Sequence, residues 1–162
     1  MIDWQAKLIW SSEQNAYVYV RREIEISSPL LSAVALVSCF SDYKLYVNGR
    51  YIGRGPGRCF ESLRYYDEYD IAYALRSGKN AVAAICYNAD ISASNRSNPA
   101  GGFLLQLELT SFDAARNVGK KATIITDENW KVKAADDWSP DSALGFGEVY
   151  DSRRKPVGWN VV

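Results

Sequence analysis

Apolar and polar residues alternate along several segments of the chain, a pattern typical of β-strands with one buried face. In the segment 17–26, charged residues fall between apolar ones: Arg21, Glu23 and Glu25 among Val18, Val20, Ile24 and Ile26. The segment 103–109 alternates in the same way, with Gln106 and Glu108 among Phe103, Leu105, Leu107 and Leu109. Both segments are therefore predicted to be strands that contact a core with one face.

Two other segments, 30–40 and 80–87, are short and apolar on both sides, as expected of central strands. The only helical signal is a short turn that Asp70 can cap and Gly78 ends. Many short strands separated by turn residues predict an all-β fold, an antiparallel β-sandwich of the jelly-roll, galactose-binding-domain-like type. The remaining strands are predicted at 43–47, 50–53, 65–71, 121–126 and 130–134.

The stretch YKLYVNGRYIGRGPGR, residues 43–58, joins a strand pattern to a glycine-rich end. A phosphate-binding loop needs its glycines to lead into a helix whose N–H groups hold the anion, and the aromatic residues that follow do not predict one. Asn48-Gly49 between two alternating runs is instead a strong signal for a hairpin turn. We therefore expect the other glycines to mark where the second hairpin strand leaves the sheet: Gly53, Gly55 and Gly57.

Composition excludes several classes of function. The 19 basic and 19 acidic residues cancel, and no basic stripe indicates nucleic acid or a membrane as a partner. The chain has no histidine, which argues against zinc enzymes, serine hydrolases and cysteine proteases. Cys39 and Cys86 lie in apolar runs and are expected to be buried thiols. Together with the odd Cys59 they favour a reducing, cytoplasmic location.

Several short motifs occur in an order that resembles a known family. They are AKLIW, RREIEI, YKLYVNGRYIGRGPGR, RYYDEYDI, the Gly-x-Asn of RSGKNAVAA, TDENWKV and GEVYDSRRKPVGW. Together they resemble the N-terminal β-sandwich domain of bacterial α-L-rhamnosidases over nearly the whole chain. The last motif is the most specific, and it departs from the usual pattern at Ser152, where alanine is common. The hairpin and Gly-x-Asn also resemble the sugar-binding sandwich of β-galactosidase-like enzymes, which is a weaker alternative.

The resemblance implies a non-catalytic module of a glycoside hydrolase whose catalytic carboxylates lie in a separate helical barrel. Its expected partners are downstream domains of the same polypeptide and rhamnose-containing glycans. Some relatives bind rhamnose through calcium, whereas others only brace the catalytic domain. Calcium binding, sugar binding and a purely structural docking role therefore stay open, and no other cofactor is expected. Residues 1–140 are predicted to form the sandwich, and the turn-rich 141–162 an irregular linker toward a further domain.

Antiparallel strand order brings three loops to one end of the predicted sandwich: 41–42, 54–65 and 88–101. Rigid sheets commonly carry ligand sites on such loops. The loops offer donors, acceptors and a ring suited to sugar hydroxyls. These candidates are Asp42, Arg54, Arg58, Tyr65, Asn88, Asp90, Asn95 and Arg96. We predict a sugar site from them, with contact to a neighbouring domain as the alternative.

Acidic residues elsewhere are weaker candidates. A free-standing glycosidase would have to use Glu61 and Asp67, but the carboxylates around Asp67 share a strand and do not flank a common space. Asp127-Glu128 and Asp136-Asp137 lack the spacing of a calcium loop and are predicted to be turn and cap residues. No catalytic residue is therefore predicted in this chain.

Overall fold

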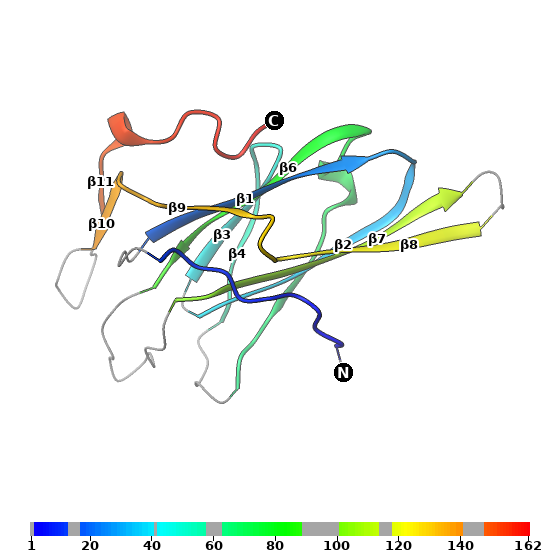
Figure 1. The fold of residues 1–162 in the computed structure, drawn as a ribbon, viewed down its shortest axis with the longest axis horizontal. Coiled ribbons are helices and arrows are strands. Elements are labelled where there is room, and N and C mark those ends of the chain that lie inside the picture. Colours follow the sequence, from blue (N-terminus) through cyan, green and yellow to red (C-terminus); the bar gives the residue numbers. More distant parts are fainter. Residues whose placement is uncertain are drawn as a thin grey trace.

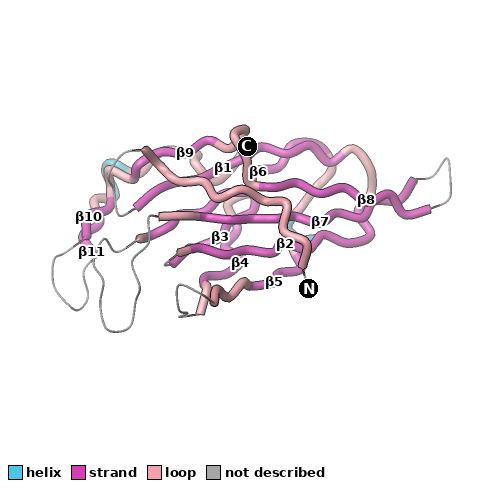
Figure 2. The backbone as a smooth tube through the Cα atoms, turned by 60° about the horizontal axis from the view of Figure 1, so that its bottom comes forward, coloured by secondary structure: helices cyan, strands magenta, loops and turns pink. Residues whose placement is uncertain are grey.

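The computed structural model describes residues 2–12, 17–40, 42–57, 63–88, 101–113, 118–140 and 148–162. Two antiparallel sheets pack face to face and confirm the predicted β-sandwich (Figure 1). The five-stranded sheet has the order β4-β3-β6-β1-β9, and the four-stranded sheet has the order β5-β2-β7-β8. Figure 2 shows that strands make up most of the described chain.

The observed strands match the predicted segments within a few residues at either end. The five-stranded sheet consists of β1 (Tyr17–Ile26), β3 (Asp42–Val47), β4 (Arg50–Gly55), β6 (Gly78–Tyr87) and β9 (Lys131–Ala134). The four-stranded sheet consists of β2 (Leu30–Cys39), β5 (Asp67–Asp70), β7 (Phe103–Asp113) and β8 (Val118–Ile125). A separate ribbon pairs β10 (Trp138–Pro140) with β11 (Glu148–Tyr150), neither of which the alternation predicted.

The helical content of the described residues is limited to single 3-10 turns. One, Ala72–Ala74, follows Asp70, whose carboxylate accepts a hydrogen bond from the Ala72 N–H at 3.0 Å, as predicted for this short turn. The other is Ser152–Arg154. Neither approaches the length and hydrophobicity of a membrane-spanning helix.

The main core lies between the two sheets and contains the inward-facing residues of their strands. Val18 and Val20 of β1 are fully buried there, and Leu105 and Leu107 of β7 are at most 1% exposed. The free thiols of Cys39 and Cys86 are also buried in this layer, which confirms the prediction for them. The alternating pattern therefore identified the core face of these strands correctly.

A second cluster covers the opposite, outer face of the five-stranded sheet. Tyr19 and Ile85 lie in it beside Trp159, which is only 8% exposed. Because β6 contacts the main core on one side and this cluster on the other, both its faces are apolar, as the sequence of 80–87 predicted. Residues 148–162, which we call the C-terminal strap, run along this side of the sheet (Figure 1).

The glycine-rich hairpin follows the prediction at its turn and at its exit, except at Gly53. Asn48 and Gly49 have φ angles of 50° and 81°, which confirms the tight turn. Gly55 is the last residue of β4, so the strand ends among the predicted glycines, whereas Gly53 lies inside the strand and does not mark its end. Instead, the absence of a side chain leaves room for groups from the other sheet. A Cβ at Gly53 would overlap the ring of Tyr69.

Candidate functional site

The predicted loops do share one end of the sandwich. Strand pairing places Cys39 opposite Phe103, Asp42 opposite Tyr87 and Tyr43 opposite Gly55. The chain therefore leaves the sheets at the same end after β2, β4 and β6, and we call this the loop end. Four of the predicted site residues lie outside the described residues: Arg58, Asp90, Asn95 and Arg96.

The other four predicted residues do not form a single pocket. Asp42 pairs with Tyr87, the last residue of β6, and Asn88 is the next residue after Tyr87. Asp42 is exposed, whereas Asn88 is buried. Arg54 is exposed and pairs with Lys44 on the outer face of the five-stranded sheet. Tyr65 precedes β5 and therefore belongs to the other sheet.

Near the loop end, a network of hydrogen bonds connects the edge strands β4 and β5. The Tyr43 hydroxyl donates to a carboxylate oxygen of Asp67 at 2.5 Å and lies 3.0 Å from the Tyr69 hydroxyl. The Tyr69 hydroxyl in turn donates to the Arg54 carbonyl at 3.3 Å. Burial raises the pKa of the Tyr43 phenol far above its ordinary value, and its hydrogen bonds to Asp67 and Tyr69 raise it further. This network joins the two sheets.

The Tyr43 network also gives Asp67 a structural role. A Cβ at Gly55 would overlap the Asp67 carboxylate, so the glycine lets this carboxylate reach Tyr43. Glu61, the other carboxylate of the glycosidase alternative, lies outside the described residues. Within the described ranges, no three cysteine or acidic side chains gather closely enough to hold a metal ion.

The remaining acidic candidates serve the fold. Asp127 accepts hydrogen bonds from the backbone and side-chain nitrogens of Asn129, both at 3.0 Å, and pairs with Arg22 at 2.9 Å. Asp137 is 2% exposed and accepts a hydrogen bond from the Tyr19 hydroxyl at 2.6 Å. Asp127 and Asp137 are thus turn residues, as predicted, and the Asp137 carboxylate also anchors Tyr19 of β1 beside the second cluster.

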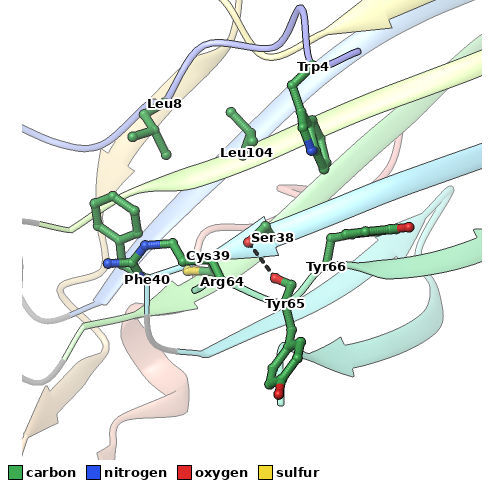
Figure 3. Close-up of a pocket in the computed structure, with 9 residues that line it drawn as sticks. All are labelled: Trp4, Leu8, Ser38, Cys39, Phe40, Arg64, Tyr65, Tyr66 and Leu104. Atoms are coloured by element: carbon green, nitrogen blue, oxygen red, sulfur yellow. Dashed lines mark hydrogen bonds between the residues drawn. The ribbon is translucent and has the colours of Figure 1, made fainter. Parts of the chain in front are cut away.

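A groove of about 180 Å³ lies at the loop end on the outer face of the four-stranded sheet (Figure 3). Ser38 and Leu104 form its floor, and the N-terminal segment supplies Trp4 and Leu8 on one side. The opposite side comes from the segment before β5, and one end from the residue after β2. These contribute Arg64, Tyr65, Tyr66 and Phe40.

Ring contacts organise the two ends of this groove. The Arg64 guanidinium lies 3.8 Å from the centroid of the Phe40 ring. The Trp4 and Tyr66 rings meet edge to face, with centroids 5.9 Å apart. Ser38 donates a hydrogen bond to the Tyr65 carbonyl at 2.8 Å, and the Tyr65 ring points away from the groove in Figure 3.

Sequence reasoning included Tyr65, and its loop 54–65 contains Arg64, but it missed the other groove residues. The N-terminal segment reaches the groove because Ile9 pairs with Phe103 and the Lys7 N–H donates to the Thr126 carbonyl. No local pattern in residues 2–10 predicts these long-range contacts. The one available signal was the density of aromatic residues around 65–66.

Comparisons with known proteins agree with one another over most of the chain. The sequence profile described as the alpha-L-rhamnosidase N-terminal domain matches residues 28–162. An alpha-L-rhamnosidase of Streptomyces avermitilis is 28% identical over 127 residues, which are 72% of this chain and 12% of that protein. The chain thus corresponds to a small part of its curated relative.

Solved structures show the same sandwich. The alpha-L-rhamnosidase from Dictyoglumus thermophilum has a TM-score of 0.81 at 23% identity, over 98% of this chain and 20% of that one. The GH78 family rhamnosidase of Bacillus sp. GL1 has a TM-score of 0.77 at 28% identity, over 93% of this chain and 16% of that one. The sandwich is therefore one portion of each of these longer chains.

Proposed function

This chain belongs to the family of α-L-rhamnosidase N-terminal domains, and from that premise we propose that it is a non-catalytic module that braces the catalytic domain of an α-L-rhamnosidase-like glycoside hydrolase. The observation that carries the proposal is the match over 28–162 to a domain that makes up only a small share of its longer relatives. Catalytic carboxylates would then belong to the remainder of the polypeptide.

The C-terminal strap supports a bracing role. It contains the motif GEVYDSRRKPVGW except for its first glycine, and its Tyr150 ring lies 4.5 Å from the Trp138 ring, between centroids. Trp159 fastens it to the sheet, while Val157 and Val161 remain exposed by 103% and 41%. Exposed apolar side chains on a well-anchored segment are suited to contact with a neighbouring domain.

Absence of catalysis has a direct test. The chain is incubated with an aryl α-L-rhamnoside, and release of the aryl group is followed by absorbance. We expect no release above a blank. Turnover that Asp67→Asn abolishes, while the thermal melting point is kept, would contradict the proposal, because it would give this carboxylate a catalytic role.

Sugar binding at the loop end is the finer part of the proposal. Asp42 and Asn88 lie at neighbouring strand ends, and carboxylate and amide oxygens suit both sugar hydroxyls and calcium. We propose that they contribute to a site for a rhamnose-class sugar, together with Arg54 and with Arg58, Asp90, Asn95 and Arg96 of the adjoining loops.

Titration of L-rhamnose, with and without calcium, tests this site by amide chemical shifts. We expect saturable shifts around Asp42 and Asn88 at roughly millimolar sugar. Asn88→Ala should abolish them, whereas Lys79→Ala, an exposed change near the turn at the opposite end, should not. If no residue responds with or without calcium, the loop end binds no rhamnose-class sugar and has only a structural docking role, which the exposed valines of the strap also favour.

A further inference from the structure

The groove between Trp4 and Arg64 is separate from the site proposed at Asp42 and Asn88. Neither of those two residues lines it, and its floor is the outer face of the four-stranded sheet. From its charge and its rings, we propose that this groove binds a carboxylate-bearing sugar of the hexuronic acid class. The proposal goes beyond the bracing function and does not depend on a rhamnose site.

The positive charge at the groove has no counter-ion among the described residues. The Arg64 guanidinium stacks on the Phe40 ring at 3.8 Å, and none of the ion pairs between described residues includes it. A guanidinium that stacks through its flat face keeps its N–H donors free at the edge. Those donors fit a carboxylate, which can accept two parallel hydrogen bonds.

The aromatic rings at the other end provide a surface for a sugar ring. Trp4 and Tyr66 meet at an interplanar angle of 80°, and Tyr66 is 45% exposed. Such rings combine a flat apolar face with a polar tip, and the C–H face of a pyranose can pack on them while its hydroxyls face water. Figure 3 shows the Arg64 guanidinium at the Phe40 end and the Trp4 ring at the other.

The size of the groove limits the ligand. Its volume of about 180 Å³ is below the roughly 300–1,000 Å³ of pockets that enclose drug-sized molecules. A single sugar ring that lies across the groove therefore fits better than an enclosed oligosaccharide. The lining is mainly apolar, so the guanidinium is the feature that selects for a negative charge.

The test compares two sugars that differ only in the charged group. Methyl β-D-glucuronide and methyl β-D-glucoside are titrated separately into the chain and followed by NMR shifts of the Trp4 indole and of backbone amides near Ser38. We expect saturable shifts with the glucuronide in the millimolar range, and an affinity at least about fivefold weaker for the glucoside. Added salt should weaken the glucuronide response more than the glucoside response.

Variants separate this groove from the other proposed site. Arg64→Gln should remove the preference for the glucuronide, and Trp4→Ala should weaken both sugars. The matched control is Arg54→Gln, since Arg54 is an exposed arginine on the other sheet. Arg54→Gln should change neither the glucuronide nor the glucoside titration, and Asn88→Ala should weaken only the response to rhamnose. Equal affinity for the glucuronide and the glucoside, no saturable response to either, or a glucuronide preference that survives Arg64→Gln would each overturn the proposal. Thermal melting of each variant checks that it is folded.

Discussion

The Asn48 side chain donates a hydrogen bond from Nδ2 to Oδ1 of Asn80 at 2.8 Å, and this bond joins two turns of the sandwich. Asn48 occupies the hairpin turn between β3 and β4, and Asn80 lies near the start of β6. Asn80 is completely buried and also bonds the backbone N–H and carbonyl of Arg76, at 2.8 and 2.7 Å. The Asn-Gly and Gly-x-Asn motifs thus form one structural unit at the end opposite the loop end.

Asn80→Ala should therefore lower the free energy of unfolding by about 2–4 kcal/mol. The change removes the hydrogen bonds that the buried Asn80 amide makes to Asn48 and to the Arg76 backbone, while Asn48 keeps its bond to the Ala74 carbonyl. Each polar group left unpaired costs about 1–3 kcal/mol. Urea denaturation measures the loss. Lys79→Ala, the exposed neighbour, should change stability by less than about 0.5 kcal/mol. Equal effects of the two substitutions would contradict a structural role for the Asn80 amide.

Gly49→Val tests the turn itself. Gly49 has a φ of 81°, and a Cβ there would lie 2.9 Å from a methyl carbon of Val161 in the strap. A β-branched residue suffers steric conflict at this φ, so we expect a loss of about 1–3 kcal/mol in unfolding free energy, measured by thermal denaturation. Sugar responses at the loop end should be unchanged because the turn lies at the other end.

Gly57→Ala is the matched control for the turn. The nearest atom to a Cβ at Gly57 is a ring carbon of Tyr65 at 3.8 Å, which is ordinary contact. Its stability should stay within about 0.5 kcal/mol of the parent chain. A Gly49→Val variant as stable as Gly57→Ala would mean that the Asn48-Gly49 turn adopts a different conformation.

The strands and the shared loop end were predictable because their signals are local. Alternation identifies a strand, Asn48-Gly49 identifies its turn, and antiparallel order then fixes which loops lie at one end. The grouping of site residues within that end was not predictable. Arg54 and Tyr65 are close in sequence, but they belong to different sheets, and only the strand pairing reveals this.

The groove and the strap depend on contacts between distant segments. Trp4 reaches the groove because Ile9 pairs with Phe103, and Trp159 reaches Tyr19 across most of the chain length. Residues 141–162 looked irregular because their turn-rich sequence carries no regular period. Their described part, 148–162, nevertheless packs through Trp159. Whether a further domain follows stays a prediction.

Trp159→Ala should detach the strap. The Trp159 ring is buried and lies 4.5 Å from Tyr19 and 5.3 Å from Tyr46, between ring centroids. Removing a buried tryptophan side chain costs about 3–5 kcal/mol. We expect faster proteolysis after Arg153 or Arg154 in the strap, detected by mass spectrometry. Val157→Ala, at a fully exposed position, should leave the cleavage rate unchanged, and similar rates for both variants would show that Trp159 does not hold the strap.

The last prediction concerns alkaline pH and the Tyr43 phenol. Burial raises the pKa of this phenol far above its ordinary value of 10.0, and the hydrogen bonds to Asp67 and Tyr69 add to the shift. Above about pH 10 the unfolded chain loses this proton while the folded chain keeps it, so rising pH favours unfolding. The contribution to stability is complete below that pH and is lost progressively above it. We expect the free energy of unfolding, measured by urea denaturation, to fall between about pH 9 and pH 11.

Tyr43→Phe isolates this contribution, because the variant has no proton to lose at that position. At neutral pH it should be less stable by about 1–3 kcal/mol, since the buried hydrogen bond to Asp67 is lost. Its further loss between about pH 9 and pH 11 should be smaller than that of the parent chain. Tyr73→Phe, at an exposed tyrosine, should keep the parent slope. Tyr19, whose pKa is also raised by burial and by its hydrogen bond to Asp137, should account for part of the slope that remains in Tyr43→Phe. If the parent and Tyr43→Phe lose stability equally over this range, the Tyr43 phenol ionises as readily in the folded chain as in the unfolded one.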